Sequence, residues 1–210
     1  MTKITNTLFF AFCTILSFCV SPLSASAQNV ATSTSAAKTT VAPATKTSNV
    51  KWYTFEEAVA AIEKDKKAGR KPKKIFIDVY TDWCGWCIKM DKETFQNPAI
   101  YPYLNEKFYP VKLNAEQKEE IKFGGYTFKY VPQERRGYHE LAASLLEGQM
   151  SYPTVLFMNE DVKMLQRIPG YLDIPTFDAI MHYLAEDHFF VTPWNVFQEK
   201  FNNEKYNKKK

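Results

Sequence analysis

Apolar and polar positions between residues 51 and 200 form segments of helical and of extended character. After Thr54, where the sequence Thr-Phe-Glu-Glu has the pattern of a capping box, apolar residues recur at helical spacing, so we expect a helix that ends near Gly69. The run over 75–80 is almost entirely apolar and rich in β-branched and aromatic residues, which predicts a central strand covered on both faces. A helix that opens the domain is therefore followed by a buried strand.

The same alternation of helix and strand continues to residue 188. Beyond the first two elements we expect helices over 88–95 and 103–108, a strand over 109–113, a β-hairpin built from 153–158 and 162–167, and an amphipathic helix over 174–188. The segment 119–150 is an insertion whose first part is polar, aromatic and without a clean period, which predicts a loop or small hairpin before helical periodicity returns at 138–146. These elements together predict an α/β domain.

The first 27 residues have the three parts of a secretory signal peptide. Lys3 precedes an apolar run over 8–20, and small residues follow at 25–27. The run has 13 residues, whereas a membrane-spanning helix needs roughly 20, so we expect export with cleavage and not a membrane anchor. Lipid attachment at Cys19 is the lesser alternative. Export predicts a periplasmic protein in an oxidising compartment.

The segments that flank the domain at 51–200 differ from it in composition. Residues 28–50 are rich in Ala, Thr, Ser and Lys, which predicts a flexible linker, and 201–210 end in three lysines, which predicts a solvated basic tail. The formal net charge of +4, from 27 Lys and Arg against 23 Asp and Glu, lacks the dense positive charge of a dedicated nucleic-acid-binding protein. We therefore expect a single-domain monomer that binds no nucleic acid.

Two of the four cysteines remain for chemistry after the signal peptide is discounted. Cys84 and Cys87 form a C-x-x-C pair between the predicted buried strand and the next helix. This position favours a thiolate at the first sulfur, because backbone N–H groups and the helix dipole are directed at it. Three residues of separation bring both sulfurs to one face, so the pair can alternate between dithiol and disulfide.

Two other interpretations of the pair stay open at this point. A zinc site normally needs four ligands, and the three histidines, His139, His182 and His188, lack the spacing that would complete one. A static structural disulfide is the second alternative. We expect no metal and no cofactor.

Residues 78–87, Asp-Val-Tyr-Thr-Asp-Trp-Cys-Gly-Trp-Cys, resemble the active-site segment of the thioredoxin superfamily. That family has an aspartate six positions before the first cysteine, a Trp just before it and a Gly just after it. The similarity extends over most of 75–185. The family members that this chain resembles most are exported proteins, such as the soluble domains of thiol:disulfide interchange proteins. The sequence departs from the family at Trp86, where thioredoxin has proline. It implies a thioredoxin-like fold, a central mixed β-sheet flanked by helices, with an insertion before the strand that follows a cis-proline.

The resemblance and the chemistry of the cysteines together imply roles for the site residues. Cys84, as the better exposed sulfur, attacks a substrate disulfide, and Cys87 resolves the mixed disulfide. Asp78 resembles the family residue that accepts the proton of the resolving thiol, with Lys112 as a candidate partner; the alternative is a purely structural carboxylate in the strand.

Four further residues are expected to bind substrate. Trp83 and Trp86 give a flat apolar rim for an extended peptide, unless they are ordinary packing residues. Tyr152-Pro153 stands where the family carries its cis-proline, and a cis bond there offers the Tyr152 backbone to a substrate strand.

We therefore expect an exported protein-disulfide reductase. Asp78 and Asp82 lie near the first sulfur in sequence and oppose negative charge there, whereas a strong oxidant stabilises its thiolate. The expected partners are protein disulfides as substrates and a membrane thiol relay as electron donor, since a reductase in an oxidising compartment stalls without one. The alternatives are a binding or chaperone module on the same fold and a thiol metal carrier.

Overall fold

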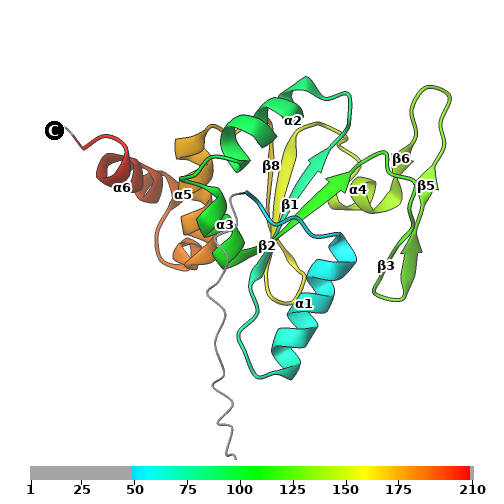
Figure 1. Ribbon diagram of the computed structural model, residues 1–210. Coiled ribbons are helices and arrows are strands. Elements are labelled where there is room, and N and C mark those ends of the chain that lie inside the picture. Colours follow the sequence, from blue (N-terminus) through cyan, green and yellow to red (C-terminus); the bar gives the residue numbers. More distant parts are fainter. Residues whose placement is uncertain (1–48, 209–210) are drawn as a thin grey trace, which may run out of the picture. The chain divides into compact units, whose positions relative to one another are not determined.

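The apolar run that follows the first helix forms β1 (Lys74–Tyr80), an inner strand of the central sheet (Figure 1). The structure, a computed structural model, describes residues 49–208. The expected signal peptide, all but the last two residues of the expected linker and the last two lysines of the expected tail lie outside the described residues. Every residue of β1 except Tyr80 is buried, which confirms the prediction of a strand covered on both faces.

The central sheet is mixed, as expected for the fold. β1 pairs in parallel with β2 (Phe108–Asn114) and antiparallel with β7 (Thr154–Met158), and β7 forms the predicted hairpin with β8 (Met164–Pro169). The strand order is β2-β1-β7-β8. The α/β class and the thioredoxin-like architecture predicted from the sequence are therefore confirmed.

Helices cover both faces of this sheet (Figure 1). The helices are α1 (Phe55–Lys67), α2 (Gly85–Met90) with the π-helical turn η1 (Asp91–Phe95), α3 (Tyr101–Lys107), α4 (Glu140–Leu145), α5 (Ile174–Ala185), the 3-10 turn η2 (His188–Phe190) and α6 (Trp194–Lys205). The predicted capping box is present at Thr54, whose side chain accepts from Glu57 N–H while the Glu57 carboxylate accepts from Thr54 N–H. None of the helices in residues 49–208 is long and apolar enough to cross a membrane.

The alternation of side chains along β1 divides the core into two clusters. Ile75, Ile77 and Val79 face the cluster that contains the inner residues of α1 and α4. Phe76 faces the opposite cluster, which contains buried residues of α2, η1, α3 and α5. Because successive strand residues point to opposite faces, Asp78 lies on the same face as Phe76, beneath α2.

The insertion consists of two small hairpins followed by a helix. β3 (Ile121–Phe123) pairs with β4 (Tyr126–Phe128), and β5 (Tyr130–Val131) pairs with β6 (Tyr138–His139), which leads directly into α4. Gly124 and Gly125 both have positive φ, 61° and 80°, as a two-residue hairpin turn requires. The expected small hairpin is present, and the sequence did not indicate the second one.

The expected solvated tail from residue 201 is wrong for its first part. Helix α6 continues to Lys205, because Phe201 stacks on Phe197 within α6 and packs against the ring of His182 in α5. The hydroxyl of Tyr206 then donates to the buried carboxylate of Asp178. These contacts hold the segment against α5.

Candidate active site

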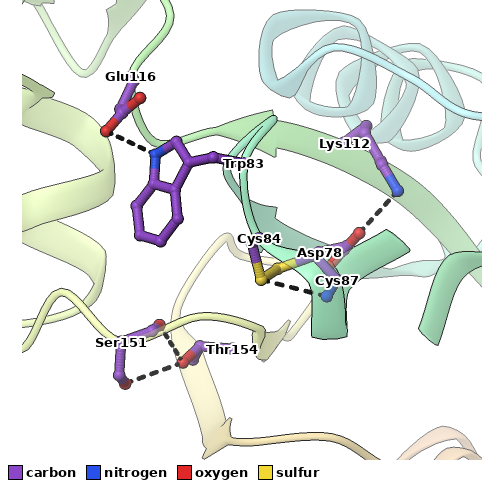
Figure 2. Close-up of a disulfide and its surroundings, with 8 residues drawn as sticks. All are labelled: Asp78, Trp83, Cys84, Cys87, Lys112, Glu116, Ser151 and Thr154. Atoms are coloured by element: carbon purple, nitrogen blue, oxygen red, sulfur yellow. Dashed lines mark hydrogen bonds and ion pairs between the residues drawn. A yellow bond between two sulfur atoms is a disulfide. The ribbon is translucent and has the colours of Figure 1, made fainter. Parts of the chain in front are cut away.

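Cys84 and Cys87 lie where β1 gives way to α2. Cys84 is the N-cap residue of α2, and its Sγ accepts a hydrogen bond from the Cys87 N–H at 3.1 Å. The two sulfurs are joined in a disulfide (Figure 2). The predicted spacing of the pair, one turn apart on one face of a helix start, is confirmed.

The cysteine pair is less accessible than the sequence suggested. Cys84 is 5% exposed and Cys87 3%, so both are buried in this disulfide form and Cys84 is the better exposed of the two by only a small margin. The reason is geometric: each sulfur covers the other, and Sγ of Cys84 is turned toward the first turn of its own helix. The disulfide therefore presents little surface to solvent.

Asp78 lies behind the disulfide with its carboxyl group buried (Figure 2). Parallel pairing of β1 and β2 sets Asp78 opposite Lys112, whose Nζ lies 2.8 Å from Asp78 Oδ2 and 3.2 Å from Asp91 Oδ1. Among the described residues neither oxygen of Asp78 has a partner with hydrogen-bond geometry, and Oδ2 meets the Lys112 ammonium as an ion pair. The aspartate thus has one oxygen paired with an ammonium group and one oxygen free.

The charges of this cluster are shifted by burial and by one another. Burial raises the pKa of Asp78, and the nearby Lys112 ammonium only partly opposes that rise. Burial lowers the pKa of Lys112, but attraction by Asp78 and Asp91 outweighs it, so the pKa of Lys112 is raised. A carboxyl group with a raised pKa beside a fixed cation is suited to accept and return a proton.

A pocket of about 180 Å³ opens beside the second cysteine. Its volume is sufficient for several water molecules, and it joins the disulfide to the charged groups around Lys112. Its lining consists of Tyr80, Thr81, Asp82, Cys87, Ile88, Asp91 and Lys112.

Two exposed tryptophans border the cysteines. Trp83 is 52% exposed, donates from Nε1 to Glu116 Oε1 at 3.0 Å, and packs edge-on against Tyr152. Trp86 is 58% exposed and contacts the ring of Tyr171. The structure therefore places both rings half-exposed at the surface near the disulfide.

The remaining expected site residue, Pro153, precedes β7. The Tyr152–Pro153 peptide bond is cis, as the resemblance implied. The Thr154 hydroxyl, one residue further, donates to the Ser151 carbonyl at 2.8 Å (Figure 2). Pro153 and the cysteines come from distant parts of the sequence, and β1–β7 pairing brings their segments together.

Sequence analysis missed four residues that the structure brings to the site. Asp91 lies four positions after Cys87 on the same helix, so helical spacing contained a signal for it. Glu116, Arg136 and Tyr171 come from segments without a local pattern, and only the tertiary structure places them beside the tryptophans.

Known proteins share parts of this sequence and this fold. Residues 62–185 match the family described as a thioredoxin-like domain. The chain is 26% identical over 121 residues to disulfide bond reductase DsbH of Chlamydia pneumoniae, across 57% of this chain and 63% of that protein. It is 35% identical over 72 residues to spermatogenesis-associated protein 20 of Homo sapiens, across 34% of this chain and 8% of that protein.

The curated relatives and a solved structure support different statements. Each of these two alignments spans less than two thirds of the relative's own length. The structure of a thioredoxin-fold protein from Helicobacter pylori superposes with a TM-score of 0.51 and 15% identity, covering 63% of this chain and 86% of that one. The likeness to this solved structure concerns the fold alone.

Proposed function

The chain belongs to the family of thioredoxin-like domains, and on this premise we propose that it is a thiol-disulfide oxidoreductase that reduces protein disulfides through Cys84 and Cys87. The observation that carries the proposal is the Cys84–Cys87 disulfide at the start of α2 with the buried carboxyl group of Asp78 behind it. The similarity to a disulfide bond reductase supports the same class of reaction.

The reaction begins from the dithiol form. The Cys84 thiolate attacks one sulfur of a substrate disulfide, a mixed disulfide forms, and the other substrate sulfur leaves as a thiolate. Cys87 then gives its proton to Asp78 and attacks Cys84 Sγ, which forms the Cys84–Cys87 disulfide and releases the second substrate sulfur. The two cysteine thiols lose two electrons to the substrate and two protons, one when the Cys84 thiolate forms and one to Asp78, and the two released substrate thiolates take up protons from water.

Asp78 is suited to the proton step by its position. Its free Oδ1 gives a site for the proton, and Lys112 on Oδ2 keeps the carboxylate form accessible despite burial. The pocket beside Cys87 is lined by Lys112, the ion-pair partner of Asp78, and we propose that the proton leaves toward this pocket after each turnover. These contacts support a role for Asp78 beyond that of a structural carboxylate.

The direction of electron flow is proposed from charge. Asp78 and Asp91 lie with Lys112 behind the pair, and Asp82 lines the same pocket, so acidic side chains outnumber the single cation there. Negative charge near the sulfurs destabilises a thiolate, which favours the disulfide form and gives a reducing couple. The signal-peptide pattern supports work in an exported, periplasmic setting, where a membrane thiol relay supplies the two electrons.

Two cysteine variants test the proposal. With dithiothreitol as the electron donor, Cys84→Ser is expected to abolish the reduction of insulin by the protein, because the nucleophile is lost. Cys87→Ser retains the first step and accumulates mixed disulfides with substrate and donor proteins. Circular dichroism of both variants controls for folding. Insulin reduction that persists in Cys84→Ser contradicts the proposal.

The redox potential of the couple tests the direction. A value near or below about −200 mV supports a reductase, and a value near about −120 mV, as in strong oxidants, overturns that part of the proposal.

A further inference from the structure

The insertion places an arginine on the active-site tryptophan. Arg136 lies in the loop between β5 and β6, and the carbon of its guanidinium group is 4.3 Å from the centre of the Trp83 ring. Trp83 immediately precedes Cys84, and its other contacts are with Glu116 and Tyr152. The arginine is thus part of the rim beside the reacting sulfur.

The position of Arg136 is set by the residue that follows it. Gly137 N–H donates to the Tyr130 hydroxyl at 3.1 Å, and a Cβ atom at Gly137 would lie 2.3 Å from that oxygen and from the Val131 carbonyl oxygen. The loop is therefore closed tightly on β5. His139, two residues further, donates from its N–H to the Ala115 carbonyl at 2.7 Å, which ties the loop to the segment that carries Glu116.

The guanidinium group of Arg136 has unused hydrogen-bonding capacity. The side chain is exposed, and no hydrogen bond or ion pair to it exists within residues 49–208. A guanidinium presents five N–H donors in one plane, and stacking on an aromatic ring fixes that plane without using those donors. Such an arrangement is prepared to bind a carboxylate through two parallel hydrogen bonds.

A second cation occupies the equivalent place on the other tryptophan. Lys89 Nζ lies 5.1 Å from the Trp86 ring centre and 5.4 Å from that of Tyr171, with only a 3.9 Å contact to the exposed Glu93. The acidic groups nearest to the first tryptophan already have hydrogen-bond donors: Glu116 accepts from Trp83, and Asp82 accepts from Asn114 at 3.0 Å. Each tryptophan therefore has one cation on its ring, Arg136 on Trp83 and Lys89 on Trp86, while the carboxylates of Asp82, Glu116 and Glu93 keep their negative charge nearby.

We propose that Arg136 is a specificity-determining residue that binds a carboxylate of an extended, acidic peptide segment, the segment that carries the cysteine presented to Cys84. The inference rests on the proposed function and adds the chemistry of the partner to it. Lys89 attracts acidic residues on the other side of that cysteine. An extended segment fits because the two cations sit on tryptophans that border the cysteine pair from both ends.

The test uses three synthetic peptide disulfides that differ only in the residues beside the cysteine, which are Asp, Asn or Lys. The reduced protein is mixed with each peptide at low salt, and the second-order rate constant of the first turnover is measured. We expect the wild type to react roughly tenfold faster with the Asp peptide than with the Lys peptide. Arg136→Gln removes most of this preference, and Arg136→Glu reverses it.

Arg135→Gln is the matched control, because it removes the neighbouring exposed arginine, which has no contact with Trp83 in the described part of the chain. The rate constants of this variant should rank the three peptides in the same order as those of the wild type. The Asn peptide should react at the same rate with every variant. Equal slowing of all three peptides by Arg136→Gln, or no preference in the wild type, overturns the inference while leaving the proposed reductase intact. Failure of the reduced wild type to react with any peptide overturns both.

Discussion

Asp78 acquires its chemical properties from one position in a strand. Strand alternation directs its side chain beneath α2, and the register with β2 gives it Lys112 as a partner. The same carboxylate one residue earlier or later would point into the cluster of α1 and α4, where no cation stabilises it. The proton-accepting role proposed for Asp78 therefore depends on its register as much as on its identity.

Replacement of this carboxyl group is expected to slow the resolving step. Asp78→Asn keeps the shape but cannot take the Cys87 proton, so release of the second substrate thiol should fall about 100-fold at neutral pH. In the wild type the resolving step requires ionised Asp78. Because burial raises the pKa of Asp78, the rate of this step should begin to fall, as the pH is lowered, at a higher pH than it would with a carboxyl group of ordinary pKa. Single-turnover release from a Cys84 mixed disulfide, followed from pH 4 to 9, measures both effects.

The neighbouring carboxyl group of Asp82 provides the control for this experiment. Asp82→Asn removes an exposed acidic group of the same pocket that has no contact with Lys112 within hydrogen-bond distance among the described residues. It should leave the pH profile unchanged. An Asp78→Asn profile that matches the wild type would show that Cys87 loses its proton elsewhere.

The site residues that the sequence revealed are those within one short motif. Cys84, Cys87 and the two tryptophans are contiguous, and the resemblance supplied Asp78 and Pro153. Arg136 had no such signal, because its role arises only when a loop of the insertion closes on Trp83.

At the scale of elements, the β5–β6 hairpin of the insertion is closed by tight packing around one glycine, Gly137. Gly137→Ala is expected to destabilise the protein by about 1–3 kcal/mol, since the new Cβ has no room beside the Tyr130 hydroxyl and the Val131 carbonyl. It should also displace Arg136 and weaken the preference for acidic peptides. Urea denaturation of the oxidised protein gives the change in the free energy of unfolding.

Gly85 offers a matched comparison for the stability measurement. A Cβ atom at this position meets nothing within 4 Å, so Gly85→Ala should change the free energy of unfolding little. Equal stability of Gly137→Ala and the wild type would mean that the β5–β6 loop has room to move, and the fixed position assigned to Arg136 would not hold.

Elements with local signals were predictable, and elements that depend on distant partners were not. The capping box of α1 and the apolar run of β1 are determined by adjacent residues. Helix α6 has aromatic residues at helical spacing, Trp194, Phe197 and Phe201, but its apolar side is stabilised by packing on α5 and η2. The π-helical turn η1 likewise has no sequence pattern that distinguishes it from a continuing α-helix.

At the scale of the whole described domain, α6 is attached through a buried carboxylate. Asp178 in α5 pairs with Lys205 and accepts from the Tyr206 hydroxyl. Burial raises the pKa of Asp178, but bonds from His182, Lys205 and Tyr206 outweigh it, so the pKa is lowered. The stabilisation that the ionised Asp178 carboxylate gives the folded state is therefore fully present above the unfolded-state pKa of about 4. It is lost as the pH falls from that value through the lower pKa of the folded state.

Removal of the tyrosine hydroxyl should weaken this attachment. Tyr206→Phe leaves one hydrogen bond to a buried charge unmade, so the free energy of unfolding should fall by about 1–3 kcal/mol at pH 7. Reduction of a neutral peptide disulfide should be unaffected, because no site residue contacts Tyr206 among the described residues. Tyr126→Phe is the control, because Tyr126 is an exposed tyrosine in the β3–β4 hairpin. An equally large loss of stability in this control would contradict the stabilising role assigned to the Tyr206–Asp178 hydrogen bond.

The near-complete cover of the two sulfurs has a consequence for how electrons are kept. A disulfide open to solvent exchanges with any small thiol that diffuses past, whereas one as little exposed as this exchanges faster with a partner whose sulfur is held beside it on an exposed stretch of backbone. The cover thereby insulates the redox couple kinetically. Uncontrolled exchange with free small thiols is thereby slowed, which favours electron transfer between proteins that dock beside the disulfide.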